Sequence, residues 1–218
     1  KMLSRIYGIA FPTAGELKEY LDRLEEAKTK LGDTVSCYKD FDEFIKHDMD
    51  AVVLANYAHQ HAPFAIRAMY AGMHVFSEVL PCQTMKEAVE LIEAVENTGK
   101  IYAYGENYCY MPAPYEMKKL YRAGKLGEFE YGEGEYIHNC ESIWHSITYG
   151  EADHWRNCGY ATFYCTHSLG PLLTVLSEDL RRVSCMGTGQ HGPSEEYAPG
   201  VIKDDITLTF RNYGKQPE

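Results

Sequence analysis

Polar and ionisable side chains gather where two predicted parallel strands end. Residues 51–54 (AVVL) form a short apolar run that is typical of a buried parallel strand, and residues 74–76 (HVF) begin a second one. The side chains that follow these two runs are Asn56, Tyr57, His59, His61, Ser77 and Glu78. Ligands bind outside the carboxyl ends of parallel strands, and imidazoles exchange protons near neutral pH. This pattern predicts a site for ligand binding and proton transfer at that edge.

The elements that position these side chains form a strand–helix–strand unit over residues 50–84. After Pro63, apolar side chains recur at helical spacing, and Gly72 ends this predicted helix. Two parallel strands joined by a helix make a right-handed unit. Thr84 and Glu87 then have the spacing of a capping box and open a helix that Gly99 ends, before a further strand at 101–104. This alternation predicts an α/β domain with a Rossmann-like, doubly wound parallel sheet.

The second half of the chain has a different pattern. Residues 117–122 are predicted to be helical, and residues 129–137 alternate with the period of two that marks a half-exposed antiparallel strand. A helix is expected at 162–176 and strands at 182–186 and 202–211. We therefore predict a dinucleotide-binding domain over residues 1–123 and an α+β substrate and oligomerisation domain with an open, mainly antiparallel sheet over residues 124–218. Upstream, we expect a helix at 16–31, a strand at 34–38 and a small helix capped by Asp40.

Composition excludes several classes of partner. The 218 residues carry a formal net charge of −11, which argues against nucleic acid and anionic membrane surfaces. No apolar run approaches the roughly 20 residues needed to span a bilayer. The seven cysteines include no CxxC pair, as expected of reduced thiols inside a cell. We expect a cytoplasmic location.

The sequence does not support three other kinds of chemical site. Gly187-Thr-Gly-Gln-His-Gly192 matches the dinucleotide fingerprint formally, but the Pro193 segment that follows has no helical period. His138, Cys140, Glu141 and His145 lie close in sequence but match no zinc spacing, so no metal site is predicted. The sequence also has no GxSxG nucleophile elbow.

Residues 50–84 resemble the pattern DAVVIATPNxxHAPIA…AGKHVLCEKPLAxT of the Gfo/Idh/MocA family of NAD(P)-dependent oxidoreductases. Trp155-Arg156 and the His167 segment resemble a second family motif. The resemblance covers roughly residues 18–211. It implies a Rossmann domain that binds NAD or NADP, followed by an open antiparallel sheet whose face holds a sugar or cyclic polyol.

The resemblance also implies roles for individual residues. His167 would be the catalytic acid/base, with Arg156 near the nicotinamide or substrate and Tyr164 as a second acid/base candidate. The positions that correspond to cofactor contacts are Asn56, Tyr57, His61, Glu78, Asn107 and Trp155. The predicted activity is hydride transfer between the nicotinamide and a sugar or polyol hydroxyl. We also expect a homo-oligomer formed through the open sheet.

Three departures from the family pattern bear on the reaction. The family's EKP lysine corresponds to Val79, and its aspartate before the histidine corresponds to Phe163, so His167 is expected to lack an acidic partner. The first strand and its Gly-rich loop are not found, and the chain looks incomplete at both ends. Two alternatives stay open. One is an NAD-dependent glycoside hydrolase of the α-N-acetylgalactosaminidase type, which uses transient oxidation and elimination; the other is a non-catalytic sugar- or nucleotide-binding protein.

Overall fold

The structure, a computed structural model, describes one long segment and several shorter ones. Residues 40–136 are described without a gap; the others are residues 25, 28–30, 36, 38, 140–148, 150, 154–158, 164–177, 180, 182–184, 186–189 and 205–207. The chain divides into two compact units, Lys1–Gly105 and Glu106–Glu218. Each unit is described by itself.

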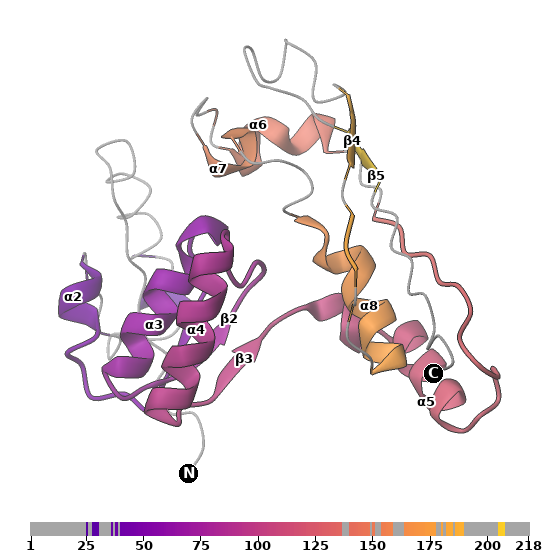
Figure 1. The fold of residues 1–218 in the computed structure, drawn as a ribbon. Helices are drawn as coiled ribbons and strands as arrows, with labels where there is room; N and C mark the ends of the chain where they lie inside the picture. The colour runs from indigo at the N-terminus through magenta and orange to yellow at the C-terminus, as the bar shows by residue number, and fades with distance from the viewer. Residues whose placement is uncertain are drawn as a thin grey trace. The chain divides into compact units, whose positions relative to one another are not determined.

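The first unit is a parallel sheet with helices. In chain order its elements are α2 (Phe41–Phe44), β1 (Ala51–Leu54), η1 (Ala58–Gln60), α3 (His61–Tyr70), β2 (His74–Ser77), α4 (Met85–Thr98) and β3 (Tyr102–Tyr104). The strands lie in the order β1-β2-β3 and all pair parallel; β2 and β3 are labelled in Figure 1. Val52 pairs with Val75, and Val75 pairs with Tyr102. The predicted alternation of strands and helices is confirmed, and with it the Rossmann-type α/β class of this unit.

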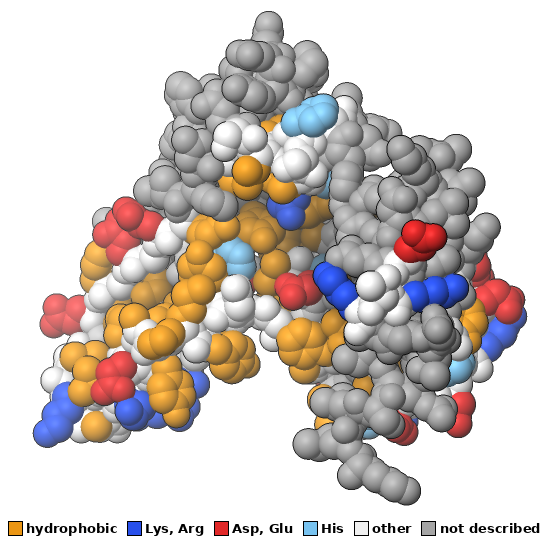
Figure 2. Space-filling view, turned by 180° about the vertical axis from the view of Figure 1, so that it is seen from behind, with side chains coloured by type: hydrophobic (Ala, Val, Ile, Leu, Met, Phe, Trp, Pro, Cys, Tyr) orange, Lys and Arg blue, Asp and Glu red, His pale blue; other side chains and the backbone are white. Residues whose placement is uncertain are grey.

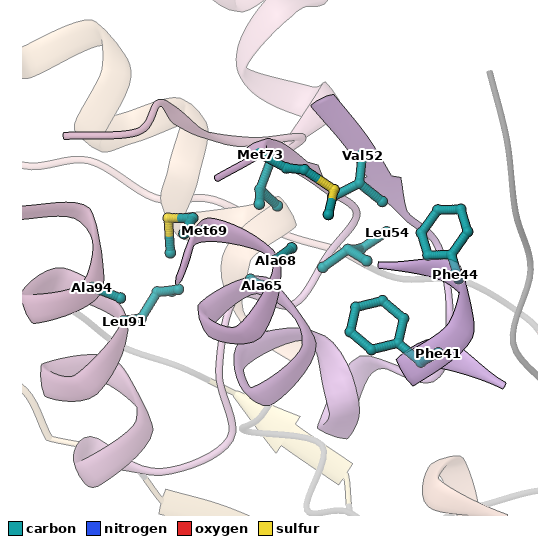
Figure 3. Close-up of a cluster of buried hydrophobic side chains, with 11 residues drawn as sticks. Phe41, Phe44, Val52, Leu54, Ala65, Ala68, Met69, Met73, Leu91 and Ala94 are labelled. Carbon is teal, nitrogen blue, oxygen red and sulfur yellow. The ribbon is translucent and has the colours of Figure 1, made fainter. Parts of the chain in front are cut away.

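The core of the first unit lies between the sheet and its helices. Figure 3 shows Val52 and Leu54 of β1 facing Ala65 and Ala68 of α3, with side chains of α2 and α4 closing the cluster. Along β1, buried and exposed residues alternate: Val52 and Leu54 are buried, whereas Ala51 and Val53 are exposed. The small alanines of α3 let that helix approach the strand closely, which fixes the loops at the carboxyl ends of the strands.

Helix α4 begins at the capping box that the sequence predicts. The Thr84 Oγ1 accepts from the backbone N–H of Glu87 at 3.1 Å, and Glu87 Oε2 accepts from the N–H of Thr84 at 3.0 Å. Gly99 ends the helix in the left-handed conformation, with φ +63°, where a side chain would be strained. The predicted start and end of this helix are both confirmed.

We expect Thr84→Ala to lower the free energy of unfolding by about 1 kcal/mol, because it leaves an N–H of the first turn without its acceptor. Urea unfolding followed by circular dichroism measures this change. Met85→Ala is the matched control, since the Met85 side chain is 81% exposed, and it should change stability by less than about 0.5 kcal/mol. Equal stability of Thr84→Ala and the control would contradict the expectation.

The second unit contains mainly helices among its described residues. Its elements are η2 (Asn107–Tyr110), α5 (Pro112–Arg122), η3 (Glu141–Ile143), α6 (Trp144–Ile147), α7 (Trp155–Cys158), α8 (Thr166–Leu176), β4 (Met186–Gly189) and β5 (Asp205–Thr207). Helix α5 packs against α8 and η2. This packing places α5 in the second unit, so the boundary at Gly105 differs from the predicted one, which put residues up to 123 in the first domain.

The strand predicted at 129–137 is wrong over its described part, because residues 129–136 form no regular secondary structure. The period of two is nevertheless real. A Cβ on Gly134 would lie 2.2 Å from the Ser168 backbone oxygen, so only glycine permits this close approach to α8. The side chains that alternate with Gly132 and Gly134 are exposed, namely those of Tyr131, Glu133 and Glu135. The alternation therefore reflects packing of an extended segment on a helix and not a strand ladder.

Other predicted strand boundaries differ from the observed ones by a few residues. The strand predicted at 182–186 is seen as β4, after non-regular residues 182–184, and β5 falls within the predicted 202–211. Gly187 and Gly189 lie in β4, which pairs antiparallel with β5. A phosphate loop would instead lead from a strand into a helix. Of the helix predicted at 16–31, residues 25 and 28–30 are helical, and its other residues lie outside the described ones. Most of the strand predicted at 34–38 also lies outside them, as do residues 190–192 at the end of the glycine motif.

Hydrophobic side chains also reach the surface, between charged ones (Figure 2). On α5 they include Tyr115, Met117 and Leu120. Among the helices that the structure describes, none combines the length and apolar character needed to cross a membrane.

Candidate active site

His167 and Glu106 form a buried pair in the second unit. His167 lies in the first turn of α8, and Glu106 precedes η2 and caps it by accepting from the N–H of Tyr108. The His167 Nδ1 lies 2.6 Å from Glu106 Oε1, and the two side chains are 7% and 5% exposed. A carboxylate accepts, so Nδ1 donates, and this fixes the tautomer in which Nε2 keeps its lone pair. The prediction that His167 lacks an acidic partner is therefore wrong.

Three tyrosine rings surround the His167 imidazole. Tyr108 stacks on it with ring centroids 4.5 Å apart. Tyr136 and Tyr164 meet it edge to face, with centroids at 4.7 Å and 5.1 Å. Such packing holds the imidazole in one orientation and keeps bulk water from it. The arrangement is that of a general acid/base oriented by a carboxylate.

Tyr136 is a hydrogen-bond donor over an extended pH range. Burial raises the pKa of its phenol, the neighbouring Tyr108 and Cys140 raise it further, and Arg156 opposes them. The protonated phenol can therefore act as a hydrogen-bond donor at neutral pH.

The three predicted catalytic residues lie in one neighbourhood. The Tyr164 ring contacts His167, and the Arg156 guanidinium lies 6.0 Å from the Tyr164 ring centroid. Arg156 also lies 4.4 Å from the ring centroid of Trp155, a cation–π distance. Nearby, Trp144 Nε1 donates to the buried Asn157 at 2.8 Å. Among the described residues, no three His, Cys, Asp or Glu side chains converge on a metal position.

The predicted cofactor residues divide between the two units. Asn56 and Tyr57 follow β1 directly, and Glu78 follows β2 as an exposed residue. His61 is the first residue of α3 and is 1% exposed. Asn107 is exposed in η2 and Trp155 is half-buried in α7, so these two belong to the second unit.

The Asn56 side chain offers an acceptor at the strand end. Its Nδ2 donates to Gln60 at 3.4 Å, while its buried Oδ1 has no partner within the described part of the chain. A ribose hydroxyl or a carboxamide N–H would satisfy this oxygen, so the site fits a dinucleotide. Val79, at the position of the family lysine, is half-buried and cannot transfer a proton; the Val79–Leu80 peptide bond is cis.

Two residues of this site were missed from the sequence. Glu106 is an acidic residue just after β3, the third parallel strand. Its position at a strand end is the same signal that marked the polar residues after the first two strands. Tyr136 lies at the end of the segment misread as a strand, and no local signal marks it. The predicted set otherwise included His167, Tyr164 and Arg156.

Part of the chain is similar to known proteins. Residues 11–106 match the Gfo/Idh/MocA family, described as an oxidoreductase family with an NAD-binding Rossmann fold. A "Glycosyl hydrolase family 109 protein 2" from Shewanella sp. (strain ANA-3) is 34% identical over 136 residues, which are 61% of this chain and 30% of that protein. A protein with the same description from Bacteroides fragilis (strain YCH46) is 31% identical over 140 residues, or 61% of this chain and 32% of that protein. The matched part thus spans about a third of these relatives.

Solved structures share the fold. The scyllo-inositol dehydrogenase of Lactobacillus casei, with bound NAD(H) and scyllo-inositol, is similar with a TM-score of 0.69 at 17% identity, over 93% of this chain and 58% of that one. The myo-inositol 2-dehydrogenase of Lactobacillus plantarum is similar with a TM-score of 0.65 and 19% sequence identity. The match covers 88% of this chain and 54% of that one. The chain thus matches the Gfo/Idh/MocA oxidoreductase family over residues 11–106, and the described part of its first unit has the parallel α/β architecture of an NAD-binding Rossmann fold.

Proposed function

We propose that this chain belongs to an NAD(P)-dependent enzyme that oxidises a hydroxyl-bearing carbon of a sugar or cyclic polyol. The observation that carries the proposal is the buried Glu106–His167 pair enclosed by tyrosines. It occurs in a chain whose first unit has an NAD-binding fold. A carboxylate, an imidazole and phenols are the groups that bind sugar hydroxyls and move their protons.

The first unit would hold the cofactor through the strand-end residues Asn56, Tyr57 and Glu78. When bound, the nicotinamide supplies the acceptor for a hydride, which is chemistry that side chains cannot provide. The second unit supplies the proton chemistry. The Nε2 of His167 accepts the proton of the sugar hydroxyl, and the Glu106 carboxylate stabilises the imidazolium that results.

The unpartnered Glu106 Oε2 supports a polyhydroxylated substrate. Within the described residues this buried oxygen has no hydrogen-bond partner, as is also true of Thr166 Oγ1 beside His167 in the sequence. Buried polar atoms are rarely left unsatisfied. Hydroxyl groups of a sugar are donors that would satisfy both atoms. The names of the similar inositol dehydrogenases agree with this substrate class.

The second candidate function is an NAD-dependent glycoside hydrolase. Two observations favour it: the curated relatives are described as glycosyl hydrolases, and Val79 removes the lysine of the dehydrogenase pattern. In this reaction a sugar carbon is oxidised, which acidifies the neighbouring C–H. Loss of that proton expels the glycosidic leaving group, water adds, and re-reduction returns the hydride, so the cofactor is unchanged overall. His167 with a protonated tyrosine such as Tyr136 supplies the acid and the base.

One experiment distinguishes the two candidates. The full-length protein, purified with its bound dinucleotide, is incubated with nitrophenyl glycosides and separately with free sugars and inositols. Steady NADH formation from free sugars supports the dehydrogenase. Release of nitrophenol without net NADH supports the glycosidase. Binding of sugar with neither reaction would leave the non-catalytic binding protein and overturn the enzyme proposal. A homo-oligomer and a cytoplasmic location stay predictions.

A further inference from the structure

The extended segment 129–136 passes close to α8, the helix that carries His167. Gly132, Gly134 and Tyr136 lie two residues apart on this segment. In an extended chain, residues two apart point to the same side, so these three positions share one face. The ring of Tyr136 meets the His167 imidazole edge to face, with centroids 4.7 Å apart. Two glycines thus precede, on the same face, a tyrosine that contacts the acid/base candidate.

Both glycines approach α8 at short range. A Cβ on Gly132 would lie 3.2 Å from the Leu172 side chain, and a Cβ on Gly134 would overlap the Ser168 backbone oxygen. As the segment advances from residue 132 to residue 134, its contact on α8 moves back from residue 172 to residue 168. Two extended residues span about 6.6 Å, and four helical residues rise about 6 Å. Because the two repeats nearly match, the segment runs antiparallel to α8 with its glycine face against the helix.

The two glycines are required by this approach and not by their own backbone conformation. Neither has the positive φ that the structure shows at Gly124 and Gly127. A residue with a side chain could adopt the same backbone, and its chain would lose less conformational entropy on folding than glycine does. At position 134 the absence of a Cβ is what lets the chain touch the helix backbone. Gly134 therefore serves the contact with α8.

We propose that Gly134, assisted by Gly132, is the positioning residue that sets Tyr136 against His167. Tyr136 follows Gly134 by two residues, so a displacement of the glycine moves the tyrosine directly. With a Cβ at position 134, the segment would have to move by about 1 Å to restore an ordinary carbon–oxygen contact of about 3.3 Å. A misplacement of about 1 Å can lower a catalytic rate by about a hundredfold. The proposal rests on the proposed function only in giving Tyr136 a part in proton transfer.

The segment 129–136, and not α8, is the part that moves when the contact is overfilled. Helix α8 has 11 residues and packs on α5 and η2. A helix resists local displacement because its backbone hydrogen bonds form cooperatively. The segment has no regular secondary structure. Relief of an overlap at position 134 therefore falls on the segment and on the tyrosine at its end.

Fluorine NMR tests the position of Tyr136 without reference to catalysis. The full-length protein is labelled with 3-fluorotyrosine, and the Tyr136 signal is assigned by its loss in Tyr136→Phe. We expect Gly134→Ala to move this signal toward that of free fluorotyrosine, because the ring leaves its aromatic neighbours. Glu135→Ala, an exposed change beside the tyrosine, should leave the signal in place. An unmoved signal in folded Gly134→Ala would overturn the proposal.

Gly132→Ala keeps the test decisive if Gly134→Ala does not fold. The three atoms nearest to a Cβ at position 132 all belong to side chains, which can move aside more easily than a helix backbone. We therefore expect a folded protein with a smaller shift of the Tyr136 signal in the same direction. If this signal is also unmoved, the glycine face does not position the tyrosine.

A double-mutant cycle tests whether the glycine acts through the tyrosine. Alone, Gly134→Ala should lower kcat by about 10–100-fold. In Tyr136→Phe, where the phenol is already absent, the same change should alter kcat by less than about threefold, because the two residues act as one unit. An equal loss in both backgrounds would place the effect in α8 or in stability and overturn the positioning role. If Tyr136→Phe keeps full activity, the part of Tyr136 in proton transfer fails, whereas the fluorine result still decides its positioning.

Discussion

His167→Ala is expected to lower kcat by at least about a hundredfold, the low end of the effect of losing a general acid/base. The reason is that Nε2 of His167 is the nitrogen left with a lone pair once Nδ1 donates to Glu106. Steady-state kinetics in whichever assay the wild type supports, nitrophenol release or NADH formation, measures the loss. An activity within about threefold of wild type would remove His167 from the mechanism.

The alanine variant also leaves the Glu106 carboxylate buried and unpaired, which is destabilising by itself. His167→Asn separates folding from catalysis, because its amide nitrogen can occupy the place of Nδ1 and keep the bond to Glu106. It should fold and yet be as slow as His167→Ala. His145→Ala, an exposed histidine of the same unit, is the matched control and should retain wild-type activity.

Glu106→Gln should lower kcat by about 10–100-fold, the usual cost of removing a group that orients a reacting side chain. Glutamine keeps the size of the side chain and can still accept from Nδ1, but it removes the negative charge that stabilises the imidazolium. The acidic limb of the pH–rate profile should therefore move to lower pH, because the ring loses its proton more readily. The profile of kcat/KM between about pH 4 and 9 measures the shift.

A merely structural role for Glu106 would lower the melting temperature without moving that limb, and this result would contradict the prediction. Glu116→Gln is the matched control. Glu116 is exposed on α5 and pairs with Lys119 at 2.8 Å. Its replacement should change neither kcat nor the pH profile, because solvent screens an exposed pair.

Local patterns were enough to predict the first unit. The apolar run 51–54, the capping box at Thr84 and the glycine at 99 each act over a few residues, and the structure has β1 and the two ends of α4 as expected. Such signals are decided by hydrogen bonding and burial close in the chain. The segment 129–136 shows their limit, because a period of two reports one buried face but does not say whether a strand or a helix covers it.

The sequence by itself predicted the NAD-binding fold and, through a family resemblance, pointed to His167 as the acid/base candidate, because both rest on short local motifs. Only the tertiary structure decided the partners of His167. Glu106 is separated from it by 61 residues, and its carboxylate reaches the imidazole because η2 packs on α8. The same holds for His61, whose two ring nitrogens contact carbonyl oxygens on different loops. A motif names the reacting side chain, whereas the packing of distant segments sets its protonation and orientation.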